Sequence, residues 1–368
     1  MAQVFSHCFA STYTEARRKF LDAARAAEAS VQSFTSERTG PDGEPLATDV
    51  AYLGAPGAAK LLVMISGTHG VEALCGSGIQ TGWLLERGFD DLPDDCAALL
   101  IHCINPFGAA WRRRVNEDNV DVNRNFVDHG KPHFENPHYG EFHDLLVPAG
   151  AAQPVCLQTD PGIGGFRRER GEDVFQLAML GQYSHPNGIN FGGHEPVWSA
   201  GVIDSLIEEH CRQRAHLATM DLHTGLGFFG HGLVGIANDP DSPQAGYSRA
   251  WYGPAMTTFA EAGEQAGYPD YNQFIDGLLM RAFIKRLPAV NVVAAGIEFG
   301  TYPNEQVLAA EIADLWLYNN PQAEPALAER IRSEMLRVYY PATPDWLEMV
   351  WWRARQAIRQ TLRGLAAL

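Results

Sequence analysis

Short apolar runs recur along the chain at the length of buried strands. Five such runs are Lys60–Ser66, Ala97–Ile104, His216–Leu222, Gly232–Ala237 and Val290–Ile297. Strands of a parallel sheet are covered on both faces, so their sequences are continuously apolar instead of alternating. The pattern therefore predicts five strands, most of them in the interior of a sheet.

Segments of helical composition and spacing lie around these runs. They cover Thr12–Ser30, Ala73–Arg87, Ser199–Arg214, Thr257–Ala266, Asn304–Leu317, Ala323–Val338 and Pro344–Leu365. Strands that alternate with helices favour an α/β fold with a mostly parallel or mixed twisted sheet and helices on both faces. No shift in composition marks a boundary, so residues 1–368 are expected to form a single domain.

Two stretches interrupt this alternation. Residues 39–43 combine glycine and proline and predict a turn. Residues 127–193 are rich in Pro, Gly, His and Asn and are expected to form an irregular insertion. Long loops in compact domains tend to be functional, so the insertion is expected to reshape a binding pocket.

Charge and composition limit the classes of partner. Hydrophobic residues make up 46% and charged residues 20%, as in a well-buried globular protein. The net charge of −16 repels phosphate backbones and anionic membranes, so neither is expected as a partner. The sequence shows no signal-peptide pattern and no apolar run long enough for a membrane span. With 6 scattered cysteines that are expected to be reduced, these features predict a cytoplasmic protein.

Four polar positions each follow one of the strongly apolar runs. They are His69, Asn105, His223 and Glu298. In open α/β sheets, ligands bind outside the carboxyl ends of the strands. Four separate segments can therefore deliver polar side chains to the same edge of one sheet.

His69 and Glu72 form a His-x-x-Glu pair on a turn that contains glycines. Zinc favours imidazole nitrogen and carboxylate oxygen, and a catalytic zinc site keeps one position open for water. A surface histidine beside a helix-start glutamate is the commoner situation, so the pair needs a third ligand. His223 supplies it in this hypothesis, and Asp221 either orients the ligands or caps a loop.

Several motifs resemble those of the zinc metallocarboxypeptidase family, which includes carboxypeptidase A. Gly67–Glu72 (GTHGVE) is similar to the first zinc motif, and Arg114–Phe126 (RVNEDNVDVNRNF) is similar to the family's Asn-Arg-Asn-Phe segment. Asn105–Gly108 (NPFG) and Gly296–Gly300 (GIEFG) resemble its Asn-Pro turn and catalytic Glu strand. These motifs occur in the family's order and indicate a bacterial branch of carboxypeptidase-like proteins. Asp221–Gly225 (DLHTG) also resembles the related deacylases succinylglutamate desuccinylase and aspartoacylase.

The resemblance implies a carboxypeptidase-like fold and a role for each matching residue. One Zn²⁺ ion would be held by three ligands, His69, Glu72 and His223. Glu298 would be the general base and Arg114 would stabilise the oxyanion. The substrate carboxylate would be bound by Asn123 and Arg124, since a guanidinium matches that group bidentately. Both side chains reach one substrate only if the backbone turns near Asn123.

The family also closes its site with a mobile tyrosine, for which Tyr271 and Tyr302 are the candidates. The preferred hypothesis is a zinc hydrolase that cleaves the amide bond of a peptide C-terminus or of an N-acyl amino acid with a free carboxylate. One alternative is a dedicated deacylase of the aspartoacylase type. Another is a non-catalytic protein that binds carboxylates. A homo-oligomer and a second metal in the histidine-rich insertion stay open.

Overall fold

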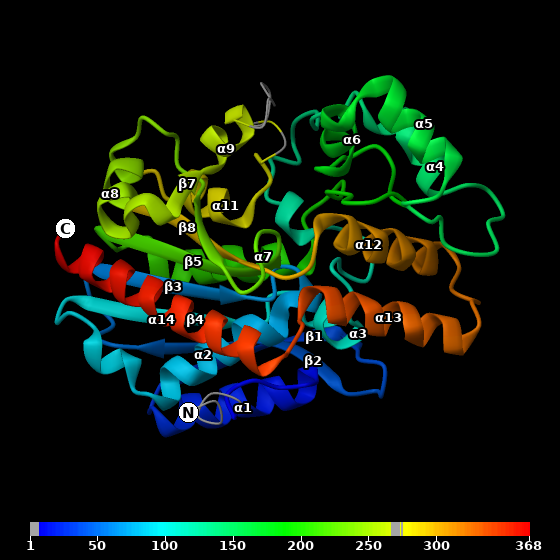
Figure 1. Ribbon diagram of the computed structural model, residues 1–368. Helices are drawn as coiled ribbons and strands as arrows, with labels where there is room; N and C mark the ends of the chain where they lie inside the picture. Colours follow the sequence, from blue (N-terminus) through cyan, green and yellow to red (C-terminus); the bar gives the residue numbers. More distant parts are fainter. Residues whose placement is uncertain (1–6, 266–272, 274) are drawn as a thin grey trace.

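The computed structural model describes residues 7–265, 273 and 275–368, and in this part of the chain eight strands form one mixed sheet (Figure 1). The strands are β1 (Ser30–Thr39), β2 (Pro45–Leu53), β3 (Lys60–Ser66), β4 (Cys96–His102), β5 (His216–Gly225), β6 (Gly232–Ile236), β7 (Met256–Thr258) and β8 (Asn291–Gly300). Their order across the sheet is β1-β2-β4-β3-β5-β8-β6-β7. The mixed α/β sheet predicted from the sequence is confirmed.

The centre of the sheet is parallel and its margins contain the antiparallel pairs. β4, β3, β5 and β8 run parallel to one another and correspond to the four strongly apolar runs. β2 is antiparallel to β4 and to β1, and β6 is antiparallel to β8. The sequence did not predict β1 and β2, although the turn at residues 39–43 lies between them, and it did not predict β7.

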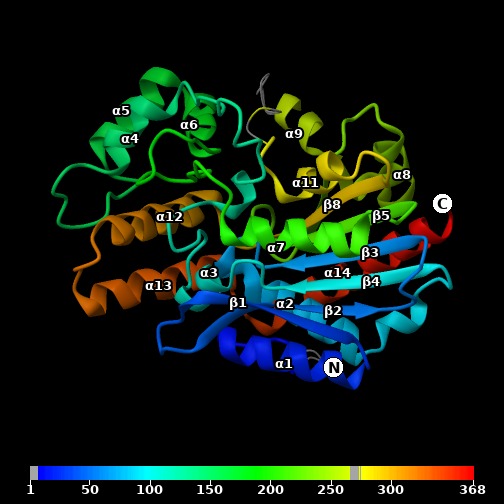
Figure 2. The same ribbon diagram turned by 180° about the vertical axis from the view of Figure 1, so that it is seen from behind.

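Helices cover the sheet on both sides. They are α1 (Tyr13–Ala26), α2 (Ala73–Leu85), α3 (Pro106–Trp111), α4 (Tyr139–Leu146), α5 (Pro161–Arg170), α6 (Glu172–Met179), α7 (Trp198–Leu206), α8 (Pro243–Tyr252), α9 (Phe259–Gln265), α11 (Leu279–Arg286), α12 (Asn304–Asn319), α13 (Pro325–Tyr339) and α14 (Pro344–Ala366). α1, α2, α8 and α14 pack on one face, whereas α7 and α11 cover the other (Figures 1 and 2).

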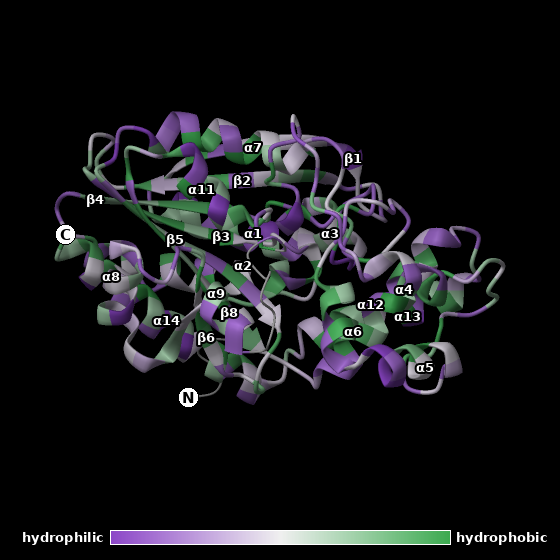
Figure 3. Cartoon of the chain, turned by 90° about the horizontal axis from the view of Figure 1, so that it is seen from above, coloured by the Kyte–Doolittle hydropathy of each residue, from purple (hydrophilic) through white to green (hydrophobic). Residues whose placement is uncertain are grey.

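The alternation of side chains along β3 explains why both faces need a cover. Leu62 and Met64 belong to the core on one face, whereas Leu61, Val63 and Ile65 belong to the core on the other. All five side chains are fully buried. Figure 3 shows the central strands as largely hydrophobic, in contrast to the mixed surface of the outer helices.

The segment 127–193, expected to be irregular, contains the three short helices α4, α5 and α6. Together with α12 they form a small core of their own that includes Tyr139, Phe142 and Ile312. Each helix has only 8 to 10 residues, and α5 begins with Pro161 after the cap Asp160. Such short helices, separated by Pro and Gly, have too few turns to produce a clear periodic pattern.

All six cysteines are unpaired, and Cys156 is exposed while the other five are buried. Among the described residues, none of the helices combines the length and the apolar character that crossing a membrane requires.

Candidate metal centre and substrate cavity

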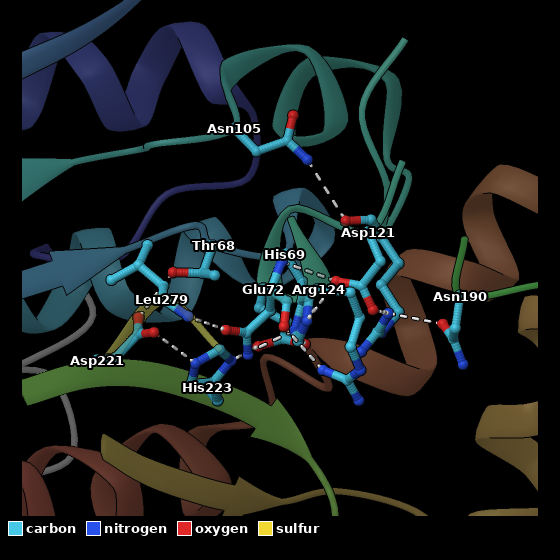
Figure 4. Close-up of polar contacts among 12 residues, drawn as sticks. Thr68, His69, Glu72, Asn105, Asp121, Arg124, Asn190, Asp221, His223 and Leu279 are labelled. Atoms are coloured by element: carbon cyan, nitrogen blue, oxygen red, sulfur yellow. Dashed lines mark hydrogen bonds and ion pairs between the residues drawn. The ribbon is translucent and has the colours of Figure 1, made fainter. Parts of the chain in front are cut away.

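Three parallel strands bring most of the predicted site residues to one edge of the sheet. β5 lies between β3 and β8, so the carboxyl ends of all three strands meet there. His223 and Glu298 are paired in register across β5 and β8, which puts their side chains on the same face of the sheet. His69 follows the end of β3 after two residues. The edge predicted from the sequence is therefore the place where these side chains meet, and Figure 4 shows His69 and His223 close together there.

The loop after β3 is held in place by α3. A Cβ atom on Gly70 would lie 2.1 Å from the backbone of Gly108, so only glycine fits at this position. The Gly70 N–H also donates to the carbonyl of Arg114 over 3.0 Å. Asn105, the fourth polar position, caps α3 by accepting a hydrogen bond from the Gly108 N–H at 2.9 Å. Asn105 thus supports the loop that presents His69.

His69, Glu72 and His223 converge with their ligand atoms within 4.8 Å of one another, and all three are buried. The two Nδ1 atoms lie 3.3 Å apart, and the Glu72 carboxylate oxygens lie 2.7 Å from Nδ1 of His69 and 3.1 Å from Nδ1 of His223. Two ligands about 2.0–2.1 Å from a tetrahedral zinc ion would be about 3.3 Å apart. The donor atoms and their spacing therefore fit one zinc ion.

Two buried carboxylates lie behind the imidazoles, within ion-pair distance of Nε2. Oδ2 of Asp221 lies 2.9 Å from Nε2 of His223, and Oδ1 of Asp121 lies 3.4 Å from Nε2 of His69. Thr68 fixes Asp221 by donating its hydroxyl proton to Oδ1 over 2.8 Å (Figure 4). A proton on each Nε2 leaves the Nδ1 lone pairs free for a metal. The sequence allowed two roles for Asp221, which were to orient the ligands or to cap a loop. Its position beside His223 favours the orienting role.

The two glutamates of the site differ in pKa because their electrostatic surroundings are opposite. Burial opposes ionisation of Glu72, but the His69 and His223 imidazoles lower its pKa to about 2. Burial and the nearby Glu72 carboxylate raise the pKa of Glu298 to about 7. The Leu226 N–H donates to Oε1 of Glu298 over 3.1 Å and fixes the carboxyl group. Glu72 is thus suited to bind a metal, and Glu298 is suited to exchange a proton near neutrality.

A cavity of about 150 Å³ opens onto these groups. Its walls come from the strand ends, from α6 of the insertion and from α12 and α13. The charged and polar lining includes His69, Glu72, Arg114, Arg124, Glu298, Glu311 and Tyr339.

Arg114 is held on two sides by acidic groups. Its Nη1 donates to Oδ2 of Asp121 at 2.5 Å and to Oδ1 of Asn190 at 2.8 Å, and its Nε lies 3.7 Å from Oε1 of Glu311. Burial works against the charged form of Arg114, but these carboxylates outweigh it and raise the pKa of the guanidinium. Within the described ranges, Nη2 of Arg114 makes no hydrogen bond.

Asn123 and Arg124 lie on the 3₁₀ turn η3 (Val122–Arg124), so the chain does turn at the position where the substrate role required it. Arg124 lines the cavity, with Nε donating to the carbonyl of Leu180 and Nη1 to the carbonyl of Asn123. No carboxylate of a described residue forms an ion pair with Arg124. The Oδ1 atom of Asn123 accepts a hydrogen bond from the Leu279 N–H at 2.9 Å, which anchors the start of α11.

Two residues of the cavity, Glu311 and Tyr339, were not identified from the sequence. Glu311 accepts a short hydrogen bond from the Tyr339 hydroxyl, and the Tyr339 ring packs against Gly225. A charged residue among the buried apolar positions of α12 is the signal that could have revealed Glu311. Of the two tyrosines proposed to close the site, Tyr302 packs against other side chains outside the cavity lining. Tyr271 lies outside the described residues.

The histidines of the insertion contact one another instead of the metal centre. His133 stacks on Tyr183 with ring centroids 4.9 Å apart and lies edge-on to His129 at 5.1 Å. In the part of the chain that the structure describes, one group of at least three His, Cys, Asp or Glu side chains converges closely enough to hold a metal ion. It consists of His69, Glu72 and His223.

Comparisons with known proteins identify the family of this chain and several solved structures with a similar fold. A model of the family described as "Protein of unknown function (DUF2817)" matches residues 9–353. No curated protein matches the sequence.

Solved structures similar to this chain include metallocarboxypeptidases, the family that its motifs resemble. The metallo-carboxypeptidase from Burkholderia cenocepacia has 14% identity and a TM-score of 0.41, over 87% of this chain and 67% of that one. Carboxypeptidase A from Helicoverpa armigera has 12% identity and a TM-score of 0.44, over 90% and 74%. A metallo-carboxypeptidase from Pseudomonas aeruginosa has 13% identity and a TM-score of 0.43, over 91% and 68%. At these identities, function must be inferred from the residues of the site.

Proposed function

The chain belongs to the DUF2817 family, and we propose that it is a zinc-dependent hydrolase of a small amide substrate that carries a free carboxylate. One observation carries the proposal: His69, Glu72 and His223 converge as metal ligands beside Glu298, whose pKa is raised to about 7. A metal site without a base would suit a structural ion. A base with a pKa near neutrality beside an open metal site suits hydrolysis.

A zinc ion held by His69, Glu72 and His223 would polarise the scissile carbonyl and acidify a water molecule. Glu298 takes a proton from the attacking water and passes it to the leaving amine. The Leu226 N–H holds Oε1 of Glu298 during both transfers. Asp121 and Asp221 keep the two histidines oriented.

Arg114 is placed to stabilise negative charge that develops on the attacked carbonyl oxygen. Asp121 and Asn190 fix the guanidinium, and its Nη2 is left to donate to the substrate. Donors that are held before the reaction need no reorganisation in the transition state, which is why such groups are effective.

Arg124 is the better candidate for binding a permanent carboxylate. It lines the cavity and is bonded through Nε and Nη1 to two carbonyl oxygens, without an acidic partner among the described residues. A guanidinium in such surroundings gains from a carboxylate ligand. Asn123 contributes indirectly, since its carbonyl accepts from Arg124 and its side chain anchors α11.

The size of the cavity favours a substrate close to one amino acid and a small acyl group. Its volume of about 150 Å³ is below the roughly 300–1,000 Å³ of pockets for larger ligands. Met179 from α6, Leu180 directly after this helix and Leu308 from α12 give part of the lining an aliphatic character. This favours N-acyl amino acids and dipeptides over long peptides. A small cavity is also compatible with the deacylase alternative. A non-catalytic carboxylate-binding protein would not require a general base.

The proposal is tested with the zinc-loaded protein and a panel of N-acetyl amino acids, dipeptides and N-benzoyl dipeptides. We expect about one zinc per chain, hydrolysis of aliphatic substrates, and loss of both metal and activity in His223→Ala. Protein that binds zinc and hydrolyses none of the panel would contradict the proposal. A preference for N-acetyl amino acids over N-benzoyl dipeptides would favour the deacylase alternative.

A further inference from the structure

A buried acid on α12 has a place in the cavity that the proposed mechanism does not use. Glu311 is 9% exposed and lines the cavity together with His69, Arg114 and Glu298. The Tyr339 hydroxyl donates to its Oε1, and no described residue donates a hydrogen bond to Oε2. One carboxylate oxygen is thus fixed by the protein and the other is left for the cavity.

A second acid on the same helix, Asp314, forms an ion pair that has only a structural role. Asp314, one turn after Glu311, accepts from Nε of Arg113 with both oxygens, at 3.1 and 3.2 Å. It does not line the cavity of the metal centre. Glu311, in contrast, approaches Nε of Arg114 only to 3.7 Å, beyond hydrogen-bond distance.

Arg114 does not need Glu311 for neutralisation. Asp121 is fully buried and accepts a 2.5 Å hydrogen bond from Nη1 of Arg114. Burial raises the pKa of the Glu311 carboxyl, and the Arg114 guanidinium opposes that rise. When Glu311 is ionised, two carboxylates face one guanidinium, and the excess negative charge lies at the cavity wall. A buried charge without a matching partner destabilises the fold, so a group retained at this position is a candidate for a function.

We propose that Glu311 is a specificity-determining residue that rejects substrates with a second carboxylate on the acyl side of the scissile bond. The inference rests on the proposed function. Arg124 takes the carboxylate of the leaving amino acid, and Arg114 faces the scissile carbonyl. An acyl group such as succinyl carries its own carboxylate two carbons beyond that carbonyl, which brings it to the wall that Glu311 occupies.

Like charges at such short range disfavour binding and the transition state alike, because the cavity excludes most of the water that would screen them. Without Glu311, Arg114 would offer an acidic acyl group a favourable partner. Glu311 therefore converts a potentially anion-binding wall into one that accepts neutral acyl groups.

The first experiment uses the wild-type holoenzyme and three substrates with one leaving group: N-acetyl-leucine, N-succinyl-leucine and the methyl ester of the succinyl carboxylate. The ester has the length of the succinyl group without its charge. We expect kcat/KM for the two substrates with an uncharged acyl group to exceed that of N-succinyl-leucine by at least about tenfold. Equal rates for N-succinyl-leucine and its ester would overturn the inference and leave the proposed function intact.

The second experiment compares Glu311→Gln with Asp314→Asn, both zinc-loaded. Each replaces a buried acid of α12 by its amide, and the side-chain oxygen of glutamine at position 311 can still accept the hydrogen bond from the Tyr339 hydroxyl. We expect Glu311→Gln to reduce the preference for the ester over N-succinyl-leucine by at least about tenfold, and Asp314→Asn to keep it. An unchanged preference in Glu311→Gln, or the same change in both variants, would overturn the inference. Wild-type enzyme inactive on all three substrates would refute the proposed function, and the inference with it.

Discussion

Replacing Glu298 by glutamine removes its ability to accept a proton and keeps its shape. The amide oxygen can still accept the hydrogen bond that the Leu226 N–H donates over 3.1 Å. The variant also loses a negative charge that burial and Glu72 disfavour, as the pKa of about 7 indicates. Glu298→Gln should therefore be at least as stable as the wild-type protein and should keep His69, Glu72 and His223 in place for zinc.

A large loss of turnover is expected because the substitution removes the proton acceptor and leaves the metal ligands in place. General acid–base catalysis contributes about 10²–10⁴-fold, which corresponds to about 2.7–5.4 kcal/mol of activation free energy. We expect kcat for N-acetyl-leucine to fall by this factor, while zinc content and KM stay close to those of the wild type. The assay combines initial rates, metal analysis and thermal unfolding of the same preparations. Near-normal turnover at full zinc content would refute the role of Glu298, and loss of zinc would assign it to the metal site instead.

Three further predictions concern the surroundings of the site and the core. Arg124→Lys should lower kcat/KM for a free-acid substrate by about 10–100-fold and change that of its methyl ester little, since lysine cannot form a bidentate pair; equal losses would show that Arg124 does not bind the carboxylate. Asp221→Asn should weaken zinc binding by about 10–100-fold in a titration against a chelator, and unchanged affinity would mean that Asp221 does not orient His223. In the core, burial lowers the pKa of His102 to about 4, so the unfolded chain binds the proton more tightly and stability is lost as pH falls from about 6.5 to 4. This cost is about 3 kcal/mol, and urea unfolding of His102→Gln should show a correspondingly weaker dependence on pH in that range.

The sequence predicted the centre of the sheet and the convergence of His69, Glu72 and His223 because both leave strong local signals. β3 is buried along its whole length and is therefore continuously apolar. A polar side chain at the end of such a strand, or just after it, stands out from the apolar run, as His223 and His69 do. The margins of the sheet leave a weaker signal. β1 is an edge strand with largely exposed side chains, and its Ser, Gln and Glu residues resemble those of a loop.

The remaining parts of the site could not be predicted because they depend on contacts between distant segments. Glu311 and Tyr339 meet across α12 and α13, and each belongs to a helix whose pattern is otherwise that of ordinary packing. The Asn123 side chain accepts a hydrogen bond from Leu279 at the start of α11, a helix that follows the insertion in the sequence. The family resemblance suggested a substrate contact for Asn123, and the structure adds a backbone anchor that no local pattern reveals.

The order of the strands in the sheet also determines when the metal site can form during folding. His69 and His223 are separated by 154 residues, and the pairing of β3 with β5 brings them together. Closing so long a loop is entropically costly and slow, and two ligands from one short turn bind zinc only weakly in an unfolded chain. In the proposed zinc enzyme, the metal could therefore not nucleate the fold in the way that it nucleates small zinc domains, whose ligands are close in sequence. Zinc uptake would follow assembly of the sheet, so formation of the zinc-loaded protein would report the correct topology of the newly folded chain.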